Sequence, residues 1–356
     1  MSDNVDAIRW HIEEVDNQIM ELIGQRMHLA KQMGQHKMGK GMPVRHLRVE
    51  DEVLARYAAR AQRSDITEDA ARRIAHILIH ESVDAQFRLP RPEGKMITVV
   101  GATGKMGGWL VRYLGAQGHD VTVSEIVSRS PYEYELARSV GKADIVIIST
   151  PISATGELLD KVLSLEPKGT VFDIASIKTP LVPRLRQAAE SGLKVCSVHP
   201  MFGPDVESLL DRNVLVCDCG SEEGLAVAHD MFQGTGANVH EIQVEEHDKL
   251  MSYVLGMSHA LNIAFFNALV NSGLTKGELD QAASTTFRHQ ECASRRVAEE
   301  NPELYYEIQH LNPHTKEALD LLVRSIEEIR EAATADRSDE FVRIMEQGRR
   351  YLGGRS

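Results

Sequence analysis

Apolar side chains recur at helical spacing through residues 1–89, and no alternating strand pattern interrupts them. In the first part they follow alternating steps of three and four, which places them on one face of a helix from about residue 4 to 38. The residues of this apolar stripe are Ile8, Ile12, Val15, Ile19, Leu22, Leu29 and Met33. Such a helix is about 50 Å long, and a small domain cannot cover it alone. The pattern therefore predicts that a second chain packs against it.

The pattern changes after the proline-containing linker 90–94. Short apolar runs typical of buried strands then alternate with helical stretches, at residues 96–100, 121–124, 145–149, 170–174, 194–198 and 214–217. This alternation is typical of a parallel sheet with helices on both faces. From about residue 245 the spacing is helical again, as at Leu319, Leu322, Val323, Ile326 and Ile329. The sequence therefore predicts a multidomain chain: all-α at 1–89, α/β at 95–244 and all-α at 245–356.

Charge and composition narrow the class of protein. The 356 residues carry a formal net charge of −12, which argues against binding to nucleic acid or to an anionic membrane. The longest apolar runs are strand-sized, far below the ~20 residues that span a bilayer, and the acidic, polar start is unlike a signal peptide. The four cysteines have no C-x-x-C spacing, so we expect reduced core cysteines, no metal site and a cytoplasmic protein.

Two cations interrupt the stripe of the first helix. Position 26 is arginine, and a further step beyond Met33 reaches Lys37. Each needs an anion, because a buried cation without a partner is costly. Arg9 lies roughly 25 Å along the axis from Arg26, so one small ligand reaches both only if Arg9 comes from a partner chain. On pattern alone, the alternative is a coiled-coil-like dimerisation helix with a specificity-setting arginine.

The first 90 residues also resemble the all-helical chorismate mutase family, over about residues 5–88. The matching positions are Ile8-Arg9, Val15-Asp16, Gln25-Arg26, His36-Lys37, Met42-Pro43-Val44, Glu50 and Ser82-Val83-Asp84-Ala85-Gln86. In that family two intertwined chains enclose the substrate, chorismate, and rearrange it to prephenate. The resemblance implies that Arg26, together with Arg9 of the partner subunit, holds the two substrate carboxylates.

The same resemblance assigns roles to four further residues. Lys37 and Gln86 would hydrogen-bond the ether oxygen, which gains negative charge as the C–O bond breaks. Glu50 would contact the ring hydroxyl, and Ser82 would help to seat the substrate. No covalent step is required, since the rearrangement is pericyclic and is helped by restriction and by charges placed in advance.

Two positions depart from the family pattern: Val49 stands where an arginine is usual, and His46 where an aspartate is frequent. They keep open the alternative that residues 1–89 only dimerise or regulate.

A glycine-rich turn follows the first strand-like run and opens a helix. Glycines there let the backbone turn tightly and approach a pyrophosphate at the helix N-terminus. Glu125 follows the next strand at about the spacing expected for a ribose-binding acid. These signals predict a Rossmann-like dinucleotide-binding domain, with cofactor contacts from Gly101, Thr103, Gly104, Lys105, Met106, Gly107, Glu125, Thr150 and Pro151. The carboxylate favours NAD, whereas Ser128 and Arg129 leave NADP as the alternative.

Three further segments each follow a strand-like run: residues 149–152, 173–178 and 199–204. Since ligands of open parallel sheets bind beyond the carboxyl ends of the strands, we expect all three near the nicotinamide. Together with Glu246-His247-Asp248, His259 and Thr286-Phe287-Arg288, they resemble the prephenate dehydrogenase family from about Met96 to the C-terminus. The run His199-Pro200-Met201-Phe202-Gly203-Pro204 is the most specific part.

This second resemblance implies oxidative decarboxylation of prephenate with NAD⁺, which gives 4-hydroxyphenylpyruvate. His199 would be the base, oriented by Ser176, and its ordinary pKa near neutrality suits the task. Arg288 would bind a substrate carboxylate, for which a guanidinium is well shaped. His247 and His259 are further candidates for contact with the substrate.

Taken together, the two resemblances predict a bifunctional homodimeric enzyme of tyrosine synthesis, with a helical C-terminal substrate and dimerisation domain. Tyrosine is a candidate feedback inhibitor. One alternative is a dehydrogenase whose N-terminal helices only dimerise or regulate. A second is an arogenate dehydrogenase. A more distant one is a β-hydroxyacid or imine-reducing dehydrogenase of the same architecture.

Overall fold

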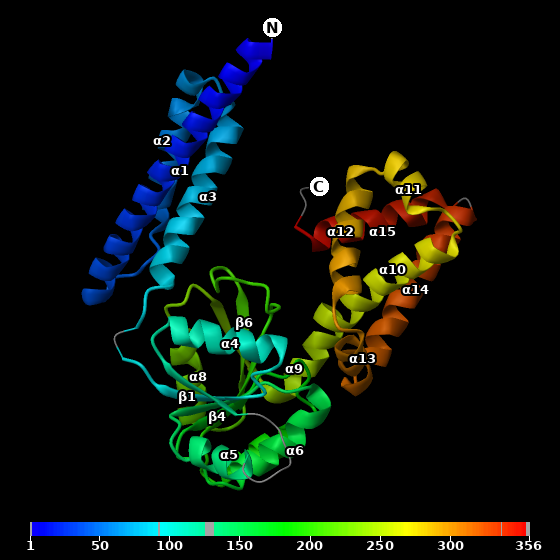
Figure 1. The fold of residues 1–356 in the computed structure, drawn as a ribbon. Coiled ribbons are helices and arrows are strands. Elements are labelled where there is room, and N and C mark those ends of the chain that lie inside the picture. The colour runs from blue at the N-terminus through cyan, green and yellow to red at the C-terminus, as the bar shows by residue number, and fades with distance from the viewer. Residues whose placement is uncertain (1, 92, 125–131, 336, 354–356) are drawn as a thin grey trace. The chain divides into compact units, whose positions relative to one another are not determined.

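The computed structural model describes residues 2–91, 93–124, 132–335 and 337–353 (Figure 1). The chain divides into two compact units. The first contains the residues up to 150 together with 158–174 and 187–241, and the second contains 151–157, 175–186 and everything from 242 onward.

Three long helices and one 3-10 turn begin the first unit. They are α1 (Ser2–Gly39), α2 (Leu47–Arg60), η1 (Ala61–Ser64) and α3 (Glu68–Phe87). Helix α3 packs against both α1 and α2, and its N-terminus is capped by Thr67, whose side chain accepts a hydrogen bond from the Ala70 N–H. Gly34 allows close approach of α1 to α3, because a Cβ at this position would lie only 2.8 Å from Cγ of Gln86.

The apolar stripe of α1 is not covered within the chain. All seven of its side chains are exposed, with 48–63% of their surface accessible. The face of α1 that is at least partly buried instead runs through Arg26, Ala30, Gly34 and Lys37. The two cations therefore lie beside the stripe, on the face toward α3, and the stripe is left as an apolar surface.

In the part of the chain that the structure describes, seven strands form one sheet in the order β2-β1-β3-β4-β5-β6-β7. Their bounds are β1 (Met96–Val100), β2 (Asp120–Ser124), β3 (Ile145–Ile148), β4 (Thr170–Asp173), β5 (Val195–Pro200), β6 (Asn213–Asp218) and β7 (Asn238–Gln243). Strands β1 to β5 pair in parallel, as predicted, whereas β6 is antiparallel to β5. The connecting helices are α4 (Lys105–Ala116), α5 (Tyr132–Val140), α6 (Ile152–Leu163), α7 (Val182–Glu190) and α8 (Glu222–Phe232).

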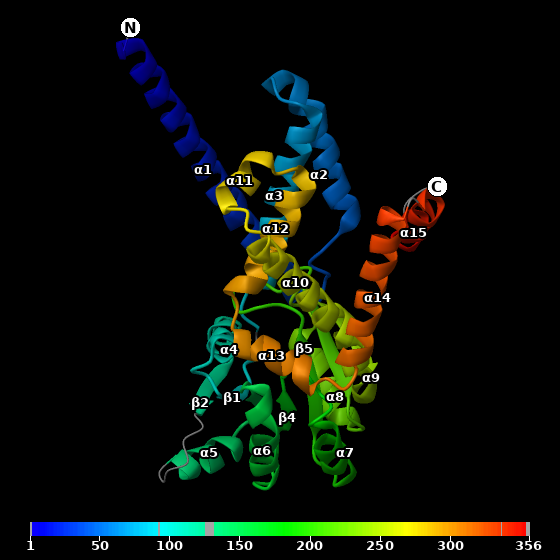
Figure 2. The same ribbon diagram turned by 90° about the vertical axis from the view of Figure 1, so that its right-hand side faces the viewer.

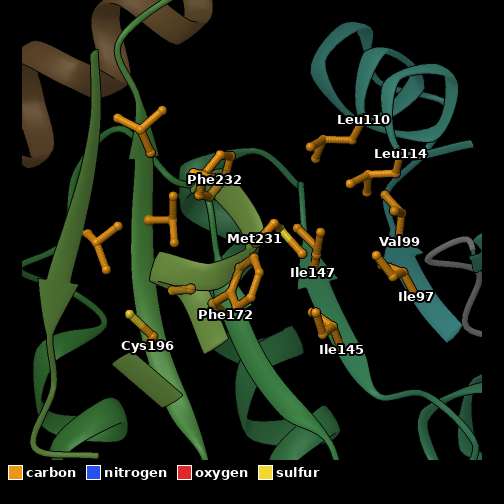
Figure 3. Close-up of a cluster of buried hydrophobic side chains, with 14 of the residues drawn as sticks. Ile97, Val99, Leu110, Leu114, Ile145, Ile147, Phe172, Cys196, Met231 and Phe232 are labelled. Atoms are coloured by element: carbon orange, nitrogen blue, oxygen red, sulfur yellow. The ribbon is translucent and has the colours of Figure 1, made fainter. Parts of the chain in front are cut away.

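The core lies between one face of the sheet and the helices α4 and α8 (Figure 3). Alternate residues of successive strands contribute to it, as expected when side chains alternate between the faces of a strand. Ile97 and Val99 come from β1, Ile145 and Ile147 from β3, and Phe172 from β4. Full burial of each such side chain stabilises the fold by about 1.5–3 kcal/mol. This core fixes the strand ends that carry the predicted site residues.

The linker is held by Arg91. Its guanidinium donates hydrogen bonds to the carbonyl oxygens of Asp230, Met231 and Gln233, over 2.7–2.9 Å. These carbonyls end α8, where free C=O groups and the negative end of the helix dipole favour a cation. The linker therefore caps a helix of the sheet domain.

The second unit is largely helical (Figure 2). From Val244 it contains α9 (Val244–Met251), a π-helical turn η2 (Ser252–Met257), α10 (Ser258–Asn271), α11 (Lys276–Ala282), α12 (Thr285–Glu299), α13 (Pro302–Leu311), α14 (Thr315–Thr334) and α15 (Ser338–Tyr351). Helix α10 packs against α12, and α14 packs against η2 and α15. Among the described residues, one continuous helix, Val244–Asn271, is long and apolar enough to cross a membrane, which is weak evidence because core helices of soluble proteins share these properties. The predicted order of helical, α/β and helical parts is confirmed.

Candidate functional site

Two of the predicted mutase residues meet between α1 and α3. The half-buried Arg26 donates hydrogen bonds from Nη1 to the carbonyl oxygen of Leu78 and to Oγ of Ser82. Burial lowers the pKa of Arg26, and the nearby Arg56 acts in the same direction. A partly desolvated guanidinium of this kind offers strong electrostatic attraction to a carboxylate.

Lys37 and Gln86 lie on the same pair of helices. Nζ of Lys37 donates to the carbonyl oxygen of Val44, and Nε2 of Gln86 donates to the carbonyl oxygen of Ser82 at 2.9 Å. Within the described residues, Oε1 of Gln86 is buried and has no hydrogen-bond partner. A buried polar atom left in this state is costly unless a ligand or water supplies the partner.

Glu50 is held by Arg45, which was not among the residues predicted from the sequence. Nε of Arg45 lies 3.0 Å from Oε1 of Glu50, and Nη1 of Arg45 lies 2.9 Å from Oδ1 of Asp211. The hydrogen bond that Arg45 donates to Glu50 raises the pKa of Arg45. Arg45 therefore places a guanidinium beside Glu50. The arginine that is usual at position 49 is replaced here by Val49. The signal of Arg45 in the sequence was only its position in the loop before α2.

Arg9 stands apart from the other mutase residues of its own chain. It is exposed, and its guanidinium pairs with Asp6 at 3.3 Å one turn away on α1. Its contribution to a site in a partner chain stays a prediction.

The glycine-rich turn has the geometry that close approach of a phosphate requires. Gly101 has φ +89°, and a Cβ there would lie 2.3 Å from the carbonyl oxygen of Ser149. A Cβ at Gly107 would lie 2.3 Å from the carbonyl oxygen of Gly101. Gly104 is the N-cap of α4 and brings no side chain onto the first N–H groups of the helix. The turn therefore fits a dinucleotide pyrophosphate.

The remaining cofactor residues surround this turn in the chain. Thr103 and Lys105 are exposed, and Met106 packs against the core. Thr150 follows β3 and contacts Gly101 closely, since its methyl group would lie 2.8 Å from a Cβ on that glycine. Pro151 precedes α6, whose first backbone N–H, that of Ile152, donates to Oε2 of Glu307 at 3.1 Å. Glu125, Ser128 and Arg129 lie outside the described residues.

His199 lies in β5 and is buried, with 4% of its surface accessible. Two residues earlier, Ser197 donates a hydrogen bond from Oγ to Oδ2 of Asp173 in β4 at 2.6 Å, and both side chains are fully buried. This bond fixes the carboxyl end of β4 against the middle of β5. Ser176 follows β4 and is half-buried.

In the second unit, His247 and Asp248 form a buried pair in the middle of α9. Nδ1 of His247 lies 2.7 Å from Oδ1 of Asp248, and His247 has no accessible surface in this chain. Asp248 also accepts hydrogen bonds from the backbone of Lys178 and Thr179. Burial alone would raise the pKa of Asp248, but the hydrogen bonds from His247, Thr179 and Lys178 hold it below its ordinary value.

His259 and Arg288 have different surroundings from this pair. The His259 ring stacks on Tyr305 with 4.1 Å between centroids, and burial lowers its pKa to about 4. Its Nδ1 is buried and has no partner among the described residues. Nη1 of Arg288 pairs with Asp280 at 2.7 Å and with Glu291 at 3.4 Å. A substrate carboxylate would compete with these two anions for the guanidinium.

Three family models match consecutive parts of the chain. "Chorismate mutase type II" matches residues 8–87, "Prephenate dehydrogenase, nucleotide-binding domain" matches 128–241, and "Prephenate dehydrogenase, dimerization domain" matches 243–347.

Individual proteins that are similar to this chain include enzymes of the same two kinds. The T-protein of Enterobacter agglomerans is 29% identical over 307 residues, covering 85% of this chain and 80% of that protein. A probable arogenate/prephenate dehydrogenase of Methanocaldococcus jannaschii is 29% identical over 271 residues, covering 72% of this chain and 61% of that protein. Among solved structures, prephenate dehydrogenase from A. aeolicus with hydroxyphenyl propionate and NAD⁺ matches with TM-score 0.59 and 18% identity, over 73% of this chain and 98% of that chain. At this identity the structural match shows the fold alone.

Proposed function

Because the chain belongs to the bifunctional family that joins a type II chorismate mutase to an NAD-dependent prephenate dehydrogenase, we propose how its residues divide the two reactions. The enzyme rearranges chorismate to prephenate and then decarboxylates prephenate oxidatively to 4-hydroxyphenylpyruvate, in tyrosine synthesis. The family and both activities predicted from the sequence are confirmed. The domain boundaries, at 89–95 and 244–245, stay predictions.

In the mutase, Arg26 and Arg9 of the partner subunit bind the two carboxylates of chorismate. The contact of Arg26 with Ser82 supports this assignment most directly, because it places a partly desolvated cation beside a hydroxyl between α1 and α3. Lys37 and Gln86 stabilise the developing charge on the ether oxygen, and the unpartnered Oε1 of Gln86 marks a place where a ligand or water belongs.

Glu50 completes the mutase site by contacting the ring hydroxyl. Its carboxylate is held by Arg45. Glu50 therefore does not need an arginine at position 49, where this chain has valine. The reaction needs no nucleophile, and the protein acts by restricting the substrate and presenting charges that need not reorganise.

In the dehydrogenase, the turn 101–107 holds the pyrophosphate of NAD on the N-terminus of α4. The space that a Cβ would fill at Gly101 and Gly107 supports this fit. NAD⁺ supplies the hydride acceptor when bound. Glu125 binds the ribose, Thr103, Gly104, Lys105 and Met106 line the turn, and Thr150 and Pro151 contact the cofactor beyond β3.

His199 removes the proton from the prephenate hydroxyl as the carbonyl forms, and Ser176 assists it. The burial of His199 in β5 supports its role as the base, because a base held in a rigid strand loses little freedom when substrate binds. Arg288 exchanges Asp280 and Glu291 for a substrate carboxylate. His259, which burial keeps neutral at physiological pH, acts beside the substrate without carrying charge to it, whereas His247 is buried against Asp248 and acts on the substrate only through that residue.

The enzyme acts as a cytoplasmic homodimer, and tyrosine is its candidate feedback inhibitor. The exposed apolar stripe of α1 supports dimerisation, since a surface of this kind is rarely left to solvent. The match to a dimerization domain at 243–347 supports a second interface in the C-terminal helices.

Arogenate is the second candidate substrate of the dehydrogenase. The probable arogenate/prephenate dehydrogenase of Methanocaldococcus jannaschii favours testing it, since that relative carries both names.

The test is a coupled assay on the purified full chain, with chorismate plus NAD⁺ and prephenate plus NAD⁺ in parallel and reduced cofactor as readout. Both substrates should reduce NAD⁺. Lys37→Ala should abolish reduction from chorismate only, and His199→Asn should abolish both while chorismate is still consumed. Consumption of prephenate by His199→Asn at the wild-type rate would overturn the assignment of His199 as the base. Arogenate and NADP⁺ are tested in the same assay, as the alternative substrate and the alternative cofactor.

A further inference from the structure

One buried carboxylate ties the loop after β4 to α9. Oδ1 of Asp248 accepts the backbone N–H of Lys178 at 2.8 Å, and Oδ2 accepts the backbone N–H of Thr179 at 2.7 Å. Asp248 has 1% of its surface accessible. Two successive amides of an irregular loop thus obtain their partners from a residue about 70 positions later in the chain.

The carboxylate is itself held in place. His247 lies 2.7 Å from the same Oδ1, and Nδ2 of Asn312 donates to the carbonyl oxygen of Asp248 at 2.7 Å. His247 and Asn312 are also buried, with 0% and 4% of their surfaces accessible. The acceptor therefore has little freedom to follow the loop if the loop moves.

The loop that is tied in this way carries Ser176, two residues before the first clamped amide. On its other side, the carbonyl oxygen of Lys178 accepts the N–H groups of Leu181 and Val182, which join the loop to the start of α7. Ser176 therefore lies on a short segment whose end is fixed by backbone hydrogen bonds. A catalytic group has to be held within about half an ångström of its productive position.

We propose that Asp248 is a positioning residue of the dehydrogenase, which fixes the loop after β4 and thereby the hydroxyl of Ser176. The role of Asp248 rests on the proposed function of Ser176 in the oxidation of prephenate. His247, which no substrate can reach without movement, serves the same end by orienting the carboxylate.

Asp248→Asn keeps the shape of the side chain but cannot accept all three donors. Its amide N–H₂ has to face at least one N–H of the loop, so one backbone donor loses its partner and the loop shifts. We expect kcat for prephenate to fall by about 10–100-fold, as when a reacting group is misplaced by about 1 Å. The KM for NAD⁺ and the mutase activity of the same chain should stay within twofold of the wild type.

Glu245→Gln is the matched control. Glu245 joins the same two segments through a bidentate pair with Arg186, 2.8 Å on each arm, but it contacts no amide of the loop and is half exposed. If it lowers kcat as much as Asp248→Asn, general docking of α7 on α9 explains the loss and the proposal is wrong.

A double-mutant cycle with Ser176→Ala separates positioning from general damage. If Asp248 acts through Ser176, adding Asp248→Asn to Ser176→Ala should lower kcat by less than about threefold further. Multiplication of the two single effects would overturn the proposal. A Ser176→Ala variant with normal kcat would instead contradict the proposed function of Ser176. The clamp, that is, the hydrogen bonds from the amides of Lys178 and Thr179 to Asp248, is then tested by amide hydrogen exchange alone.

Amide hydrogen exchange measures the clamp without reference to activity. In the wild-type enzyme the amides of residues 178 and 179 should exchange at least about tenfold more slowly than unbonded amides, and Asp248→Asn should release them. Fast exchange at both positions in the wild type would overturn the clamp even if the variant does not fold.

Discussion

The turn at the start of α4 leaves no room for a side chain at Gly107. A Cβ there would lie 2.3 Å from the carbonyl oxygen of Gly101 and 2.9 Å from Cα of Ala102. An ordinary carbon–oxygen contact is about 3.3 Å or longer, so Gly107→Ala has to push the turn and the helix apart by about 1 Å. Both neighbours are backbone atoms, and no flexible side chain can absorb the shift.

A displacement of this size breaks the fit to a pyrophosphate. A hydrogen bond near 2.9 Å that lengthens by about 1 Å passes the limit at which it still contributes. Loss of one hydrogen bond to a charged group costs about 1.5–3 kcal/mol, which corresponds to roughly 10–150-fold weaker binding of NAD⁺. The crowding also destabilises the fold by about 1–3 kcal/mol.

Calorimetric titration of NAD⁺ and thermal unfolding measure the two effects separately. Gly115→Ala is the control on the same helix, because a Cβ there meets nothing within 4 Å. It should leave NAD⁺ affinity unchanged and stabilise the protein by up to about 1 kcal/mol. Gly107→Ala protein that binds NAD⁺ within twofold of the wild type would refute the argument that this turn holds the pyrophosphate.

Three further predictions concern other parts of the molecule. Arg45→Ala removes the cation that holds Glu50 and should lower kcat/KM of the mutase about tenfold while prephenate oxidation is unchanged; an unaltered mutase would show that Glu50 needs no such support. Ile12→Asp combined with Ile19→Asp places charges on the exposed stripe of α1, so the mutase, but not the dehydrogenase, should lose activity on dilution. Sedimentation measures the association of the two chains. A mutase whose activity does not change on dilution would contradict a mutase site shared between two chains. His259 has a folded-state pKa of about 4, below its ordinary value of 6.5, so the unfolded chain takes up the proton first and stability is lost as pH falls from about 6.5 toward 4. In His259→Phe the midpoint of urea unfolding should depend less on pH across this range. An unchanged pH dependence of the midpoint would show that His259 does not cause it.

The sequence predicted best what depends on neighbours along the chain. The glycine turn is an example, because close approach of backbone to backbone at Gly101 and Gly107 is dictated by local geometry. The first six strands were also predicted, since each is a compact apolar run. Strand β7 was missed because its side chains are only exposed or half-buried, as on a sheet edge, and the reversal of β6 has no local signal.

Contacts between distant segments could not be predicted from the sequence, for a physical reason. The pairing of Arg45 with Glu50 and Asp211 depends on a loop path, and Asp211 takes a left-handed conformation, φ +59°, that nothing around it in the sequence demands. Asp248 lay inside a recognised motif, yet its partners are backbone amides, which every residue has. Exposure of the α1 stripe, in contrast, follows from length alone and was predicted.

Arg91 determines where this fused enzyme can be divided. The linker looks like a neutral tether in the sequence, but its arginine caps three carbonyls at the end of α8. A dehydrogenase freed from the mutase by cutting after residue 94 would therefore lack the cap on the C-terminus of α8, whereas a cut before residue 90 keeps it. The linker thus belongs structurally to the dehydrogenase, and any exchange of the mutase domain has to place the junction before residue 90.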